Sequence, residues 1–455
     1  MSSLLLGLLA IPKHRLAVAD YQVAHSIDVR RVIDSKALYQ HNHNQLLNPA
    51  SLTKLATTAA VLAKWGAAHK FTTKVYYTGA RNGTRIEGDL LLVGSGDPFI
   101  VSETMWEFAA HIANAGINTI NGKIRIDNKL FKTDNRAYAS SNNAYDAPIT
   151  PFGINFNTVA IRITPAMRVG ERASVQLFPF ALPSVRIIAK GVRTSAKTTR
   201  VRAIRSNSKD GKILIRVSGT IAHQREPMLI YRSITNPQRI AAEYVQGFLA
   251  ARGIKVLNNT VPTSKRTHLY SIKGYPLSYI VKGLNTFSNN YIADMLIKKL
   301  GTSKARESNA DGLGIQAVRS FLQTKVGIKS NFSLHNGSGL TTKNRFSAAQ
   351  LTKLLVYVAQ DMRLFPDFIA ALPANGLEGT MLDRITAHEG MIRVKTGTLT
   401  NPHTVAGLAG FYRSQQHGLV AFTIISNGKA RKAQPPLATL RKQQDSLLAL
   451  LATLE

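Results

Sequence analysis

The chain has 455 residues, 44% of them hydrophobic, and no cysteine. This length predicts two or three globular domains, and the composition excludes disulfide bonds and thiolate metal sites. Lys and Arg outnumber Asp and Glu by 58 to 25, and the net charge of +33 favours contact with nucleic acid, anionic lipid or a carboxylate-rich cell wall. A merely solvated basic surface explains the charge equally well. Ten of the basic residues lie between Arg186 and Arg216, beside one acid, Asp210.

The N-terminal segment contains an apolar run, Leu4–Ile11, that is too short to cross a bilayer. Ala17-Val18-Ala19 is similar to a small-x-small cleavage site ahead of Asp20, although no Lys or Arg precedes the apolar run. Residues 1–19 are therefore interpreted either as an atypical signal segment or as part of a chain that begins late relative to its true start. No other stretch is apolar enough to predict a membrane span, so any membrane contact is expected to be peripheral.

The first predicted elements are a strand, a loop and a helix. Val29–Tyr39 is predicted to be a strand with a turn at Asp34-Ser35, and a polar loop follows over residues 41–50. Apolar residues at helical spacing predict a helix from Ser51 to Lys64, because Ser51 favours a helix start and Gly66 a helix end.

The middle of the chain is predicted to be rich in strands, and the later part in helices. Strands are predicted at Lys74–Tyr77, Leu90–Val93 and Lys123–Ile126, a helix at Glu103–Ala115, and almost only strands and turns over residues 168–220. Helices are predicted at Pro237–Gly253, Pro276–Leu300, Gly314–Val326 and Ala348–Asp361, then strands at Val405–Tyr412 and Leu419–Ser426 and a helix from Pro436. This order predicts an α/β domain built from both ends of the chain, with a β-rich insertion between them.

The motif Ser51-Leu-Thr-Lys54 places a hydroxyl at the start of an apolar helix, where unpaired N–H groups and the helix dipole stabilise negative charge. Lys54 lies one turn later on the same helix face, so its amine can reach the serine. To act as a base the amine has to be neutral, and burial and a second cation such as Lys395 would both lower its pKa. On this motif alone a helix cap is the favoured interpretation of Ser51, since Ser206 and Ser426 also begin Ser-x-x-Lys.

Two later motifs reverse that preference. Ser288-Asn-Asn290 precedes a predicted helix, so that its hydroxyl can relay a proton to a leaving amine and its amide can hold a substrate carbonyl. Lys395-Thr396-Gly397-Thr398 lies on an apparent edge strand, where Gly397 leaves room for a bound peptide. The N–H groups of Thr398 and Ser51 would form an oxyanion hole, and Lys395 and Thr396 would hold a terminal carboxylate. The alternatives are turn residues and a solvated lysine, but the order of all three motifs favours catalysis.

This ordered set is the one described for penicillin-binding proteins and serine β-lactamases. Over about residues 20 to 430 the chain resembles the D-Ala-D-Ala carboxypeptidase/endopeptidase family called class C low-molecular-mass penicillin-binding proteins. Because 237 residues separate Ser51 from Ser288, the spacing differs from that of a compact β-lactamase. The segments that carry the resemblance are Pro49-Ala-Ser-Leu-Thr-Lys54, Gly94-Ser-Gly-Asp-Pro98, Asn336-Gly-Ser-Gly-Leu340, Leu372-Pro-Ala-Asn-Gly-Leu-Glu-Gly-Thr380 and Val394-Lys-Thr-Gly-Thr-Leu399.

The resemblance implies a transpeptidase-like domain split by one or two inserted domains. The expected division is a catalytic domain of residues 20–70 and 275–455, an inserted domain II of 71–165 and 221–274, and a basic β domain III of 166–220. The resemblance further implies a periplasmic or other extracytoplasmic location, peptidoglycan stem peptides as substrate, and acylation by β-lactam antibiotics.

The same resemblance implies residue roles. Ser51 is expected to be the nucleophile and Lys54 the base, with Ser288 and Asn290 assisting. Substrate binding is expected at Lys395, Thr396, Gly397 and Thr398, and at Asp146, a candidate partner for the amine of the peptide side chain. The middle motif has Asn289 where Asp is common, and His335 stands where the family often has an acid.

Other functions remain as alternatives. A β-lactamase would need a glutamate that positions the deacylating water, and no Glu-x-x-x-Asn follows Ser288, since Glu307-Ser-Asn309 has the wrong spacing. The basic stretch is also consistent with a protein that binds the cell wall or nucleic acid. The absence of aromatic residues between Phe180 and Tyr231 argues against nucleic acid. His41-x-His43 has no third ligand in the sequence pattern, so no metal and no organic cofactor are expected.

Overall fold

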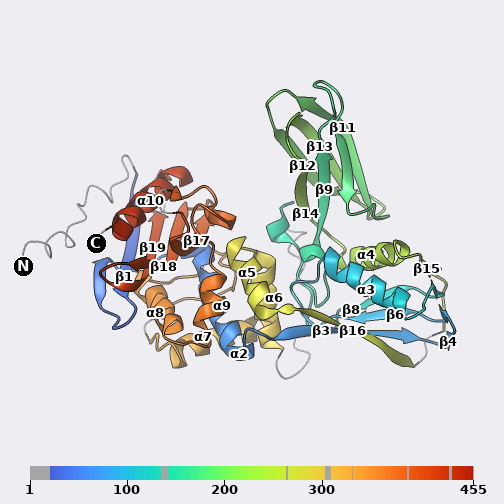
Figure 1. Cartoon of the computed structure of the whole chain (residues 1–455), viewed down its shortest axis with the longest axis horizontal. Helices are drawn as coiled ribbons and strands as arrows, with labels where there is room; N and C mark the ends of the chain where they lie inside the picture. Colours follow the sequence, from blue (N-terminus) through green and yellow to red (C-terminus); the bar gives the residue numbers. More distant parts are fainter. Residues whose placement is uncertain are drawn as a thin grey trace, which may run out of the picture. The chain divides into compact units, whose positions relative to one another are not determined.

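The computed structural model describes residues 21–134, 142–262, 265–302, 309–329, 331–386, 389–429 and 433–453 (Figure 1). These residues form two compact units. The first contains the described residues up to His69 and those from Pro276 onward, and the second is Lys70–Tyr275. The predicted signal segment, residues 1–19, lies outside the described residues. Within the described ranges, none of the helices has the length and apolar content needed to cross a membrane.

The first unit is built on a five-stranded antiparallel sheet with the order β17-β18-β19-β1-β2. The strand predicted at Val29–Tyr39 with a turn at Asp34-Ser35 is a hairpin of β1 and β2, and Ser35 turns the chain with a φ of 60°. β17 lies at the edge of the sheet, as predicted for the strand that carries Lys395. The strands are β1 (Val23–Arg31), β2 (Ala37–His41), β17 (Ile392–Leu399), β18 (Val405–Ser414) and β19 (Gly418–Gly428).

Helices cover this sheet, with α8 against β1 and β19 and α10 against β18. The helix α2 is buried at every position from Thr53 to Leu62, as expected of a helix enclosed on all sides. It packs against α5, α6, α7, α8 and α9. The elements are η1 (Ala50–Leu52), α2 (Thr53–Trp65), α5 (Leu277–Thr286), α6 (Asn290–Gly301), α7 (Ala310–Thr324), α8 (Ala348–Ala359), α9 (Phe365–Ala370), η5 (Gly379–Met381) and α10 (Leu437–Thr453).

The second unit contains four sheets and the helices α3 and α4. The sheets have the orders β16-β3-β6-β8, β15-β7-β5-β4, β10-β9-β14 and β11-β13-β12. The bounds are β3 (Lys70–Thr78), β4 (Arg81–Asn82), β5 (Arg85–Ile86), β6 (Leu90–Val93), α3 (Ser102–Asn114), β7 (Thr119–Ile120), β8 (Ile124–Asp127), β9 (Thr158–Thr164), β10 (Ser174–Phe178), β11 (Val185–Ser195), β12 (Arg200–Asn207), β13 (Ile213–Ala222), β14 (Met228–Ser233), α4 (Pro237–Ala250), β15 (Lys255–Val256) and β16 (Arg266–Pro276). The division of this insertion into domains II and III stays a prediction.

Candidate active site

Ser51 lies in the 3-10 turn η1 that leads into α2, where the sequence predicted the α-helix itself to begin. The backbone reaches this turn through Ala50, whose φ of 46° is unusual for a residue with a Cβ. The side chain of Asn48 holds the turn by accepting a hydrogen bond from the N–H of Ala50 at 2.8 Å. Pro49 and Leu52 occupy the two cap positions and make no side-chain cap bond. Ser51 is therefore not the cap of α2, and its hydroxyl is available to Lys54.

The amine of Lys54 is fully buried and has three hydrogen-bond partners. It contacts Ser51 Oγ at 3.0 Å, Asn290 Oδ1 at 2.7 Å and the carbonyl oxygen of Ser338 at 2.5 Å. An amide oxygen and a carbonyl oxygen accept hydrogen bonds and cannot donate them, whereas a hydroxyl can do both. A neutral amine has two N–H donors and one lone pair. When both donors point at the two obligate acceptors, the lone pair faces the hydroxyl of Ser51.

Burial favours this neutral form. It lowers the pKa of Lys54 from its ordinary value to about 7, while the negative charge of Asp294 acts in the opposite direction. Burial also lowers the pKa of Lys395 well below its usual range, and the charge of Lys54 is the second cause. From the sequence we expected burial and the charge of Lys395 together to make the amine of Lys54 neutral. In the structure burial is the leading cause for both lysines, and the charge that acts on Lys54 is that of Asp294, which raises its pKa, rather than that of Lys395.

The middle motif forms the turn between α5 and α6, within the helical stretch predicted over Pro276–Leu300 and just before a helix, as expected for this motif. Asn289 caps α6, because its side chain accepts a hydrogen bond from the N–H of Ile292 at 3.1 Å. Ser288 has a φ of 53°, and its hydroxyl accepts a hydrogen bond of 2.9 Å from Lys395 Nζ. The turn thus presents Ser288 to Lys395 and Asn290 to Lys54.

Side chains alternate between the two faces of β17, as they do along any strand. Lys395 and Gly397 share the face toward Ser288 and η1: a Cβ built on Gly397 would meet the carbonyl oxygen of Pro49 at 2.7 Å. Thr396 and Thr398 share the other face, where Thr396 Oγ1 donates to Thr380 Oγ1 at 2.9 Å. We predicted that Gly397 leaves room for a bound peptide. In the structure the turn that carries Ser51 occupies that space.

The outer edge of β17 is paired along its first half. The N–H of Val394 donates to the carbonyl oxygen of Pro373 at 3.0 Å, on the side away from β18. N–H groups of residues two apart point to the same side of a strand, so those of Thr396 and Thr398 face this outer edge as well. This orientation is the one that an added peptide strand and an oxyanion hole at Thr398 require.

Sequence reasoning missed several groups around this site. The segment Asn336-Gly-Ser-Gly-Leu340 was quoted as a family motif without a role. The structure gives it one, because the Ser338 carbonyl oxygen binds Lys54 and the Ser338 N–H donates to Asp294 at 3.2 Å. Gly339 lies so close to η1 that a Cβ there would meet the Ala50 carbonyl oxygen at 2.0 Å. The motif indicated that the segment matters for function. The role of the Ser338 carbonyl group could not be predicted, because every residue has a backbone carbonyl.

Asp146 does not belong to the first unit, which contains the other predicted site residues. It belongs to the second unit, in the 3-10 turn η3 (Ala144–Asp146), and is half-buried. Its assignment to the amine of the peptide side chain stays a prediction. Among the residues that the structure describes, no group of three or more His, Cys, Asp or Glu is arranged to hold a metal ion.

A buried lysine whose lone pair faces a serine at the start of a central helix, beside an edge strand with outward N–H groups, defines a serine hydrolase that works by acyl transfer. The chain matches the D-Ala-D-Ala carboxypeptidase 3 (S13) family over residues 17–451 and belongs to that family. The predicted family, the mixed α/β fold class and the class of enzyme are thereby confirmed.

Individual relatives agree with this family. The chain is 30% identical over 442 residues to the D-alanyl-D-alanine carboxypeptidase of Actinomadura sp. (strain R39), an alignment that covers 91% of this chain and 78% of the relative. It is 25% identical over 422 residues to D-alanyl-D-alanine carboxypeptidase DacB of Haemophilus influenzae, covering 88% of this chain and 84% of that one.

Solved structures show the same fold. The crystal structure of penicillin binding protein 4 (dacB) from Haemophilus influenzae superposes with a TM-score of 0.72 at 22% identity, covering 99% of this chain and 100% of that one. The Bd0816 predatory endopeptidase from Bdellovibrio bacteriovorus, solved with an immunity protein, gives a TM-score of 0.57 at 14% identity over 95% of this chain and 94% of that one.

Proposed function

We propose that this chain hydrolyses the D-Ala-D-Ala bond of peptidoglycan stem peptides through an acyl-enzyme on Ser51. The observation that carries the proposal is the set of partners of Lys54, in which Ser51 is the one group able to give the amine a proton. Endopeptidase activity on peptide cross-links follows from the same chemistry, since the scissile bond again joins a D-Ala carbonyl to an amine.

In the acylation step the neutral amine of Lys54 removes the proton of Ser51, and Oγ forms a bond to the carbonyl carbon of the penultimate D-Ala. The N–H groups of Ser51 and Thr398 stabilise the oxyanion. The proton then passes to the leaving amine by way of the Ser288 hydroxyl, the C–N bond breaks, and Lys54 is neutral again. The Asn290 side chain holds both Lys54 and the substrate.

In the second step a water molecule attacks the ester carbonyl and gives one proton to Lys54. The bond between the carbonyl carbon and Ser51 Oγ breaks, and Oγ takes that proton back. The products are the shortened stem peptide and free serine enzyme, so the two steps together consume one water molecule. Thr396 and Thr398 bind the C-terminal part of the substrate, while Lys395 holds Ser288 and Gly397 lets η1 approach the strand. Asp146 is retained as the candidate partner for the amine of the peptide side chain.

β-Lactams are proposed to acylate Ser51 in place of the peptide. Penicillin binding protein 4 from Haemophilus influenzae has been crystallised in complex with a β-lactam, and the Bd3459 endopeptidase of Bdellovibrio bacteriovorus has been solved acylated by penicillin G. The proposed substrate places the enzyme in the periplasm or elsewhere outside the cytoplasm, where peptidoglycan is found.

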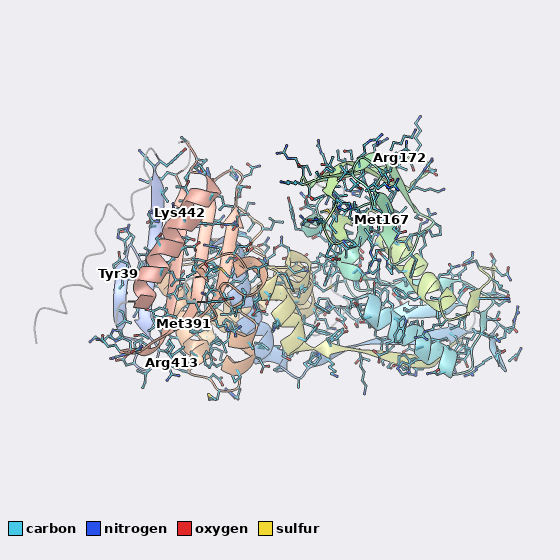
Figure 2. All side chains as sticks on the ribbon, turned by 45° about the horizontal axis from the view of Figure 1, so that its top comes forward. Tyr39, Met167, Arg172, Met391, Arg413 and Lys442 are labelled. Atoms are coloured by element: carbon cyan, nitrogen blue, oxygen red, sulfur yellow. The ribbon has the colours of Figure 1, made fainter. Side chains whose placement is uncertain are left out.

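The second unit offers a surface for the anionic wall polymer. In the sheet β11-β13-β12 the cross-strand pairs put five exposed arginines on one face, and directly paired residues share a face. The opposite face is apolar and buried through Ile213, Ile215 and Val217. Figure 2 shows nitrogen-rich side chains gathered around Arg172, which pairs with Arg193 of β11. The five arginines are Arg186, Arg193, Arg200, Arg202 and Arg216.

We propose that this arginine face retains the enzyme on the wall. Reversing two of its charges with Arg200→Glu and Arg202→Glu should lower co-sedimentation with isolated sacculi, and the effect should shrink as salt is raised. Reversing two exposed charges of the first unit, Lys343 and Arg413, is the matched control. Equal retention of both double variants would refute the wall-binding role.

The catalytic proposal is tested by digesting purified muropeptides and identifying the products by mass. The wild-type enzyme should release D-Ala from pentapeptides, and the Ser51→Ala variant should release none. Ser206→Ala removes the serine of another Ser-x-x-Lys sequence and should have full activity. Release of D-Ala by Ser51→Ala would refute the proposal. Rapid turnover of penicillin without peptide cleavage would instead support a β-lactamase.

A further inference from the structure

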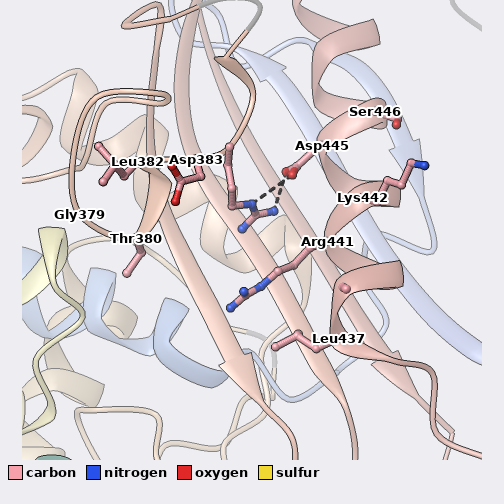
Figure 3. A pocket seen from close by; sticks show the side chains of 11 residues that line it. Gly379, Thr380, Leu382, Asp383, Leu437, Arg441, Lys442, Asp445 and Ser446 are labelled. Atoms are coloured by element: carbon pink, nitrogen blue, oxygen red, sulfur yellow. Dashed lines mark hydrogen bonds and ion pairs between the residues drawn. The ribbon is translucent and has the colours of Figure 1, made fainter. Parts of the chain in front are cut away.

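A cavity of about 680 Å³ lies on the side of β17 that carries Thr396 and Thr398. Its walls are η5 with the turn that follows it, and one face of α10. Figure 3 shows Arg441 extending from α10 toward the loop that carries Thr380. The polar side chains around the cavity include Thr380, Arg384, Arg441, Lys442 and Asp445. Of these five residues, Thr380 alone belongs to a segment that the sequence marked as a family motif.

The cavity is joined to the Lys-Thr-Gly-Thr strand by two hydrogen bonds. Thr380, on one wall, accepts a hydrogen bond of 2.9 Å from Thr396. Arg441, on the other wall, donates from Nη2 to Thr398 Oγ1 at 3.2 Å. Thr396 and Thr398 do not line the cavity themselves, but each is hydrogen-bonded to a residue that does, and each hydroxyl can rotate its proton toward a new acceptor.

The lining carries the cations Arg384, Arg441 and Lys442 and the carboxylates Asp383 and Asp445, and the two arginines differ in their partners. Arg384 is neutralised by Asp445, which accepts two hydrogen bonds from it at 2.5 and 3.1 Å. Arg441 donates to a neutral hydroxyl, and its Nε is buried with no hydrogen-bond partner in the part of the chain that the structure describes. Burial is the main cause that lowers the pKa of Arg441; the charge of Arg384 lowers this pKa further, and that of Asp445 raises it.

Lys395 is poorly placed for the same role. Its amine is fully buried on the other face of β17, where it donates to Ser288 Oγ at 2.9 Å and to the Thr396 carbonyl oxygen at 2.6 Å. An amine held by these partners serves the proton relay. A half-buried guanidinium presents several donors in one plane, which is the geometry that suits a carboxylate.

We propose that Arg441, together with the hydroxyls of Thr396 and Thr398, binds the carboxylate next to the leaving amine of the substrate, and that the cavity receives this terminal residue. The inference rests on the proposed function. Arg441 thus selects substrates whose last residue carries a free carboxylate, and the carboxylate displaces the present bond between Arg441 and Thr398.

The test compares two peptides that both end in D-Ala-D-Ala, one with a free terminal carboxylate and one with a terminal carboxamide. The wild-type enzyme should prefer the carboxylate. Arg441→Gln should lower kcat/KM for the carboxylate peptide roughly 10- to 100-fold and change that for the carboxamide less than about twofold. Arg441→Lys, which keeps the charge, should restore part of the preference. Arg413→Gln removes an exposed arginine of β18 and should match the wild type.

Four outcomes overturn the inference. Unchanged kcat/KM values for both peptides in Arg441→Gln show that another group binds the carboxylate. An equal loss on both peptides shows that Arg441 acts through the fold alone, as does a rescue by Arg441→Lys that is the same for both. In these three cases the proposed function stands. If the wild-type enzyme cleaves neither peptide, the proposed function fails, and the inference fails with it.

Discussion

Ser288 and Lys395 stand 107 residues apart in the chain and are joined by a hydrogen bond of 2.9 Å from the lysine amine to the serine hydroxyl. The bond depends on an unusual backbone at Ser288, whose φ of 53° is in the left-handed region. For a residue with a Cβ this conformation is unfavourable by about 1 kcal/mol. Such a conformation at the point where two motifs meet suggests that the hydroxyl is held there for function.

Replacing Ser288 separates these two effects. Ser288→Ala and Ser288→Gly both remove the hydroxyl, and each should lower the rate of β-lactam acylation by about 100-fold, the lower range for a lost proton relay. Ser288→Gly should nevertheless be more stable than Ser288→Ala by about 1 kcal/mol, because glycine adopts a positive φ without strain. Acylation kinetics and denaturant unfolding measure the two quantities. Equal stability of the two variants would contradict the strain, and unchanged acylation would contradict the relay.

The pH dependence of acylation should follow Lys54. Because burial lowers the pKa of this amine to about 7, the reactive neutral form is scarce below pH 7 and predominant above it. The second-order rate constant for acylation should therefore rise about tenfold per pH unit on the acid side and level off above about pH 7.

Asp294 supplies a control for that assignment. Its negative charge raises the pKa of Lys54, so Asp294→Asn should move the midpoint of the profile to lower pH. The asparagine side-chain oxygen can still accept the hydrogen bond from the Ser338 N–H that Asp294 accepts at 3.2 Å. A midpoint that stays in place, or moves to higher pH, would show that another group controls the reaction.

Gly397 is predicted to tolerate no side chain. A Cβ there would meet the Pro49 carbonyl oxygen at 2.7 Å, so Gly397→Ala should push η1 and Ser51 away from β17. We expect a loss of stability of about 1–3 kcal/mol and a large loss of acylation. Gly191, in β11, is the matched control, because a Cβ added there would have nothing within 4 Å. A Gly397→Ala variant as active and stable as Gly191→Ala would contradict the close approach.

Asp97, in the family segment Gly94–Pro98, is predicted to make stability depend on pH. Burial raises the pKa of its carboxyl to about 7, while the N–H of Phe99 donates to it at 2.8 Å. Between about pH 4 and 7 the folded chain then holds a proton that the unfolded chain has lost. This proton makes stability fall as pH rises through that window, by at most about 1.4 kcal/mol per pH unit.

Asp97→Asn removes the titrating group and keeps an acceptor for the N–H of Phe99. The difference in unfolding free energy between wild type and variant should therefore change across pH 4 to 7 and stay constant above about pH 7. Urea titrations at a series of pH values measure this difference. A difference that does not vary with pH would show that Asp97 is ionised throughout the range.

Local pattern was sufficient to predict much of the fold. β6 has the predicted bounds Leu90–Val93, and α2 ends where Gly66 stops it with a φ of 78°. In both cases the signal lies within a few residues of sequence. The turn at Ser288 before a helix was also predicted, and the structure adds that Asn289 caps that helix, α6.

Some residues of the candidate site could likewise be predicted from local sequence, and others could not. Ser51, Lys54, Ser288, Asn290 and Lys395 could be predicted because side-chain chemistry was present in ordered motifs. In the structure Lys54 is hydrogen-bonded to Ser51 and Asn290, and Lys395 to Ser288. The Ser338 carbonyl oxygen could not be predicted, since every residue has a carbonyl group. Arg441 could not be predicted either, because one arginine among 58 basic residues acquires meaning when α10 places it beside Thr398.

The proposed mechanism depends above all on the activation of Ser51 by Lys54. Mapping the site of penicillin acylation tests this activation directly. The protein is incubated with penicillin, digested and analysed by mass spectrometry. We predict one adduct on the peptide that contains Ser51, absent from Ser51→Ala and formed at least about 1,000-fold more slowly in Lys54→Met, on the order expected for losing the base of an activated nucleophile. An adduct on another residue, or undiminished acylation of Ser51 in Lys54→Met, would show that the mechanism is wrong.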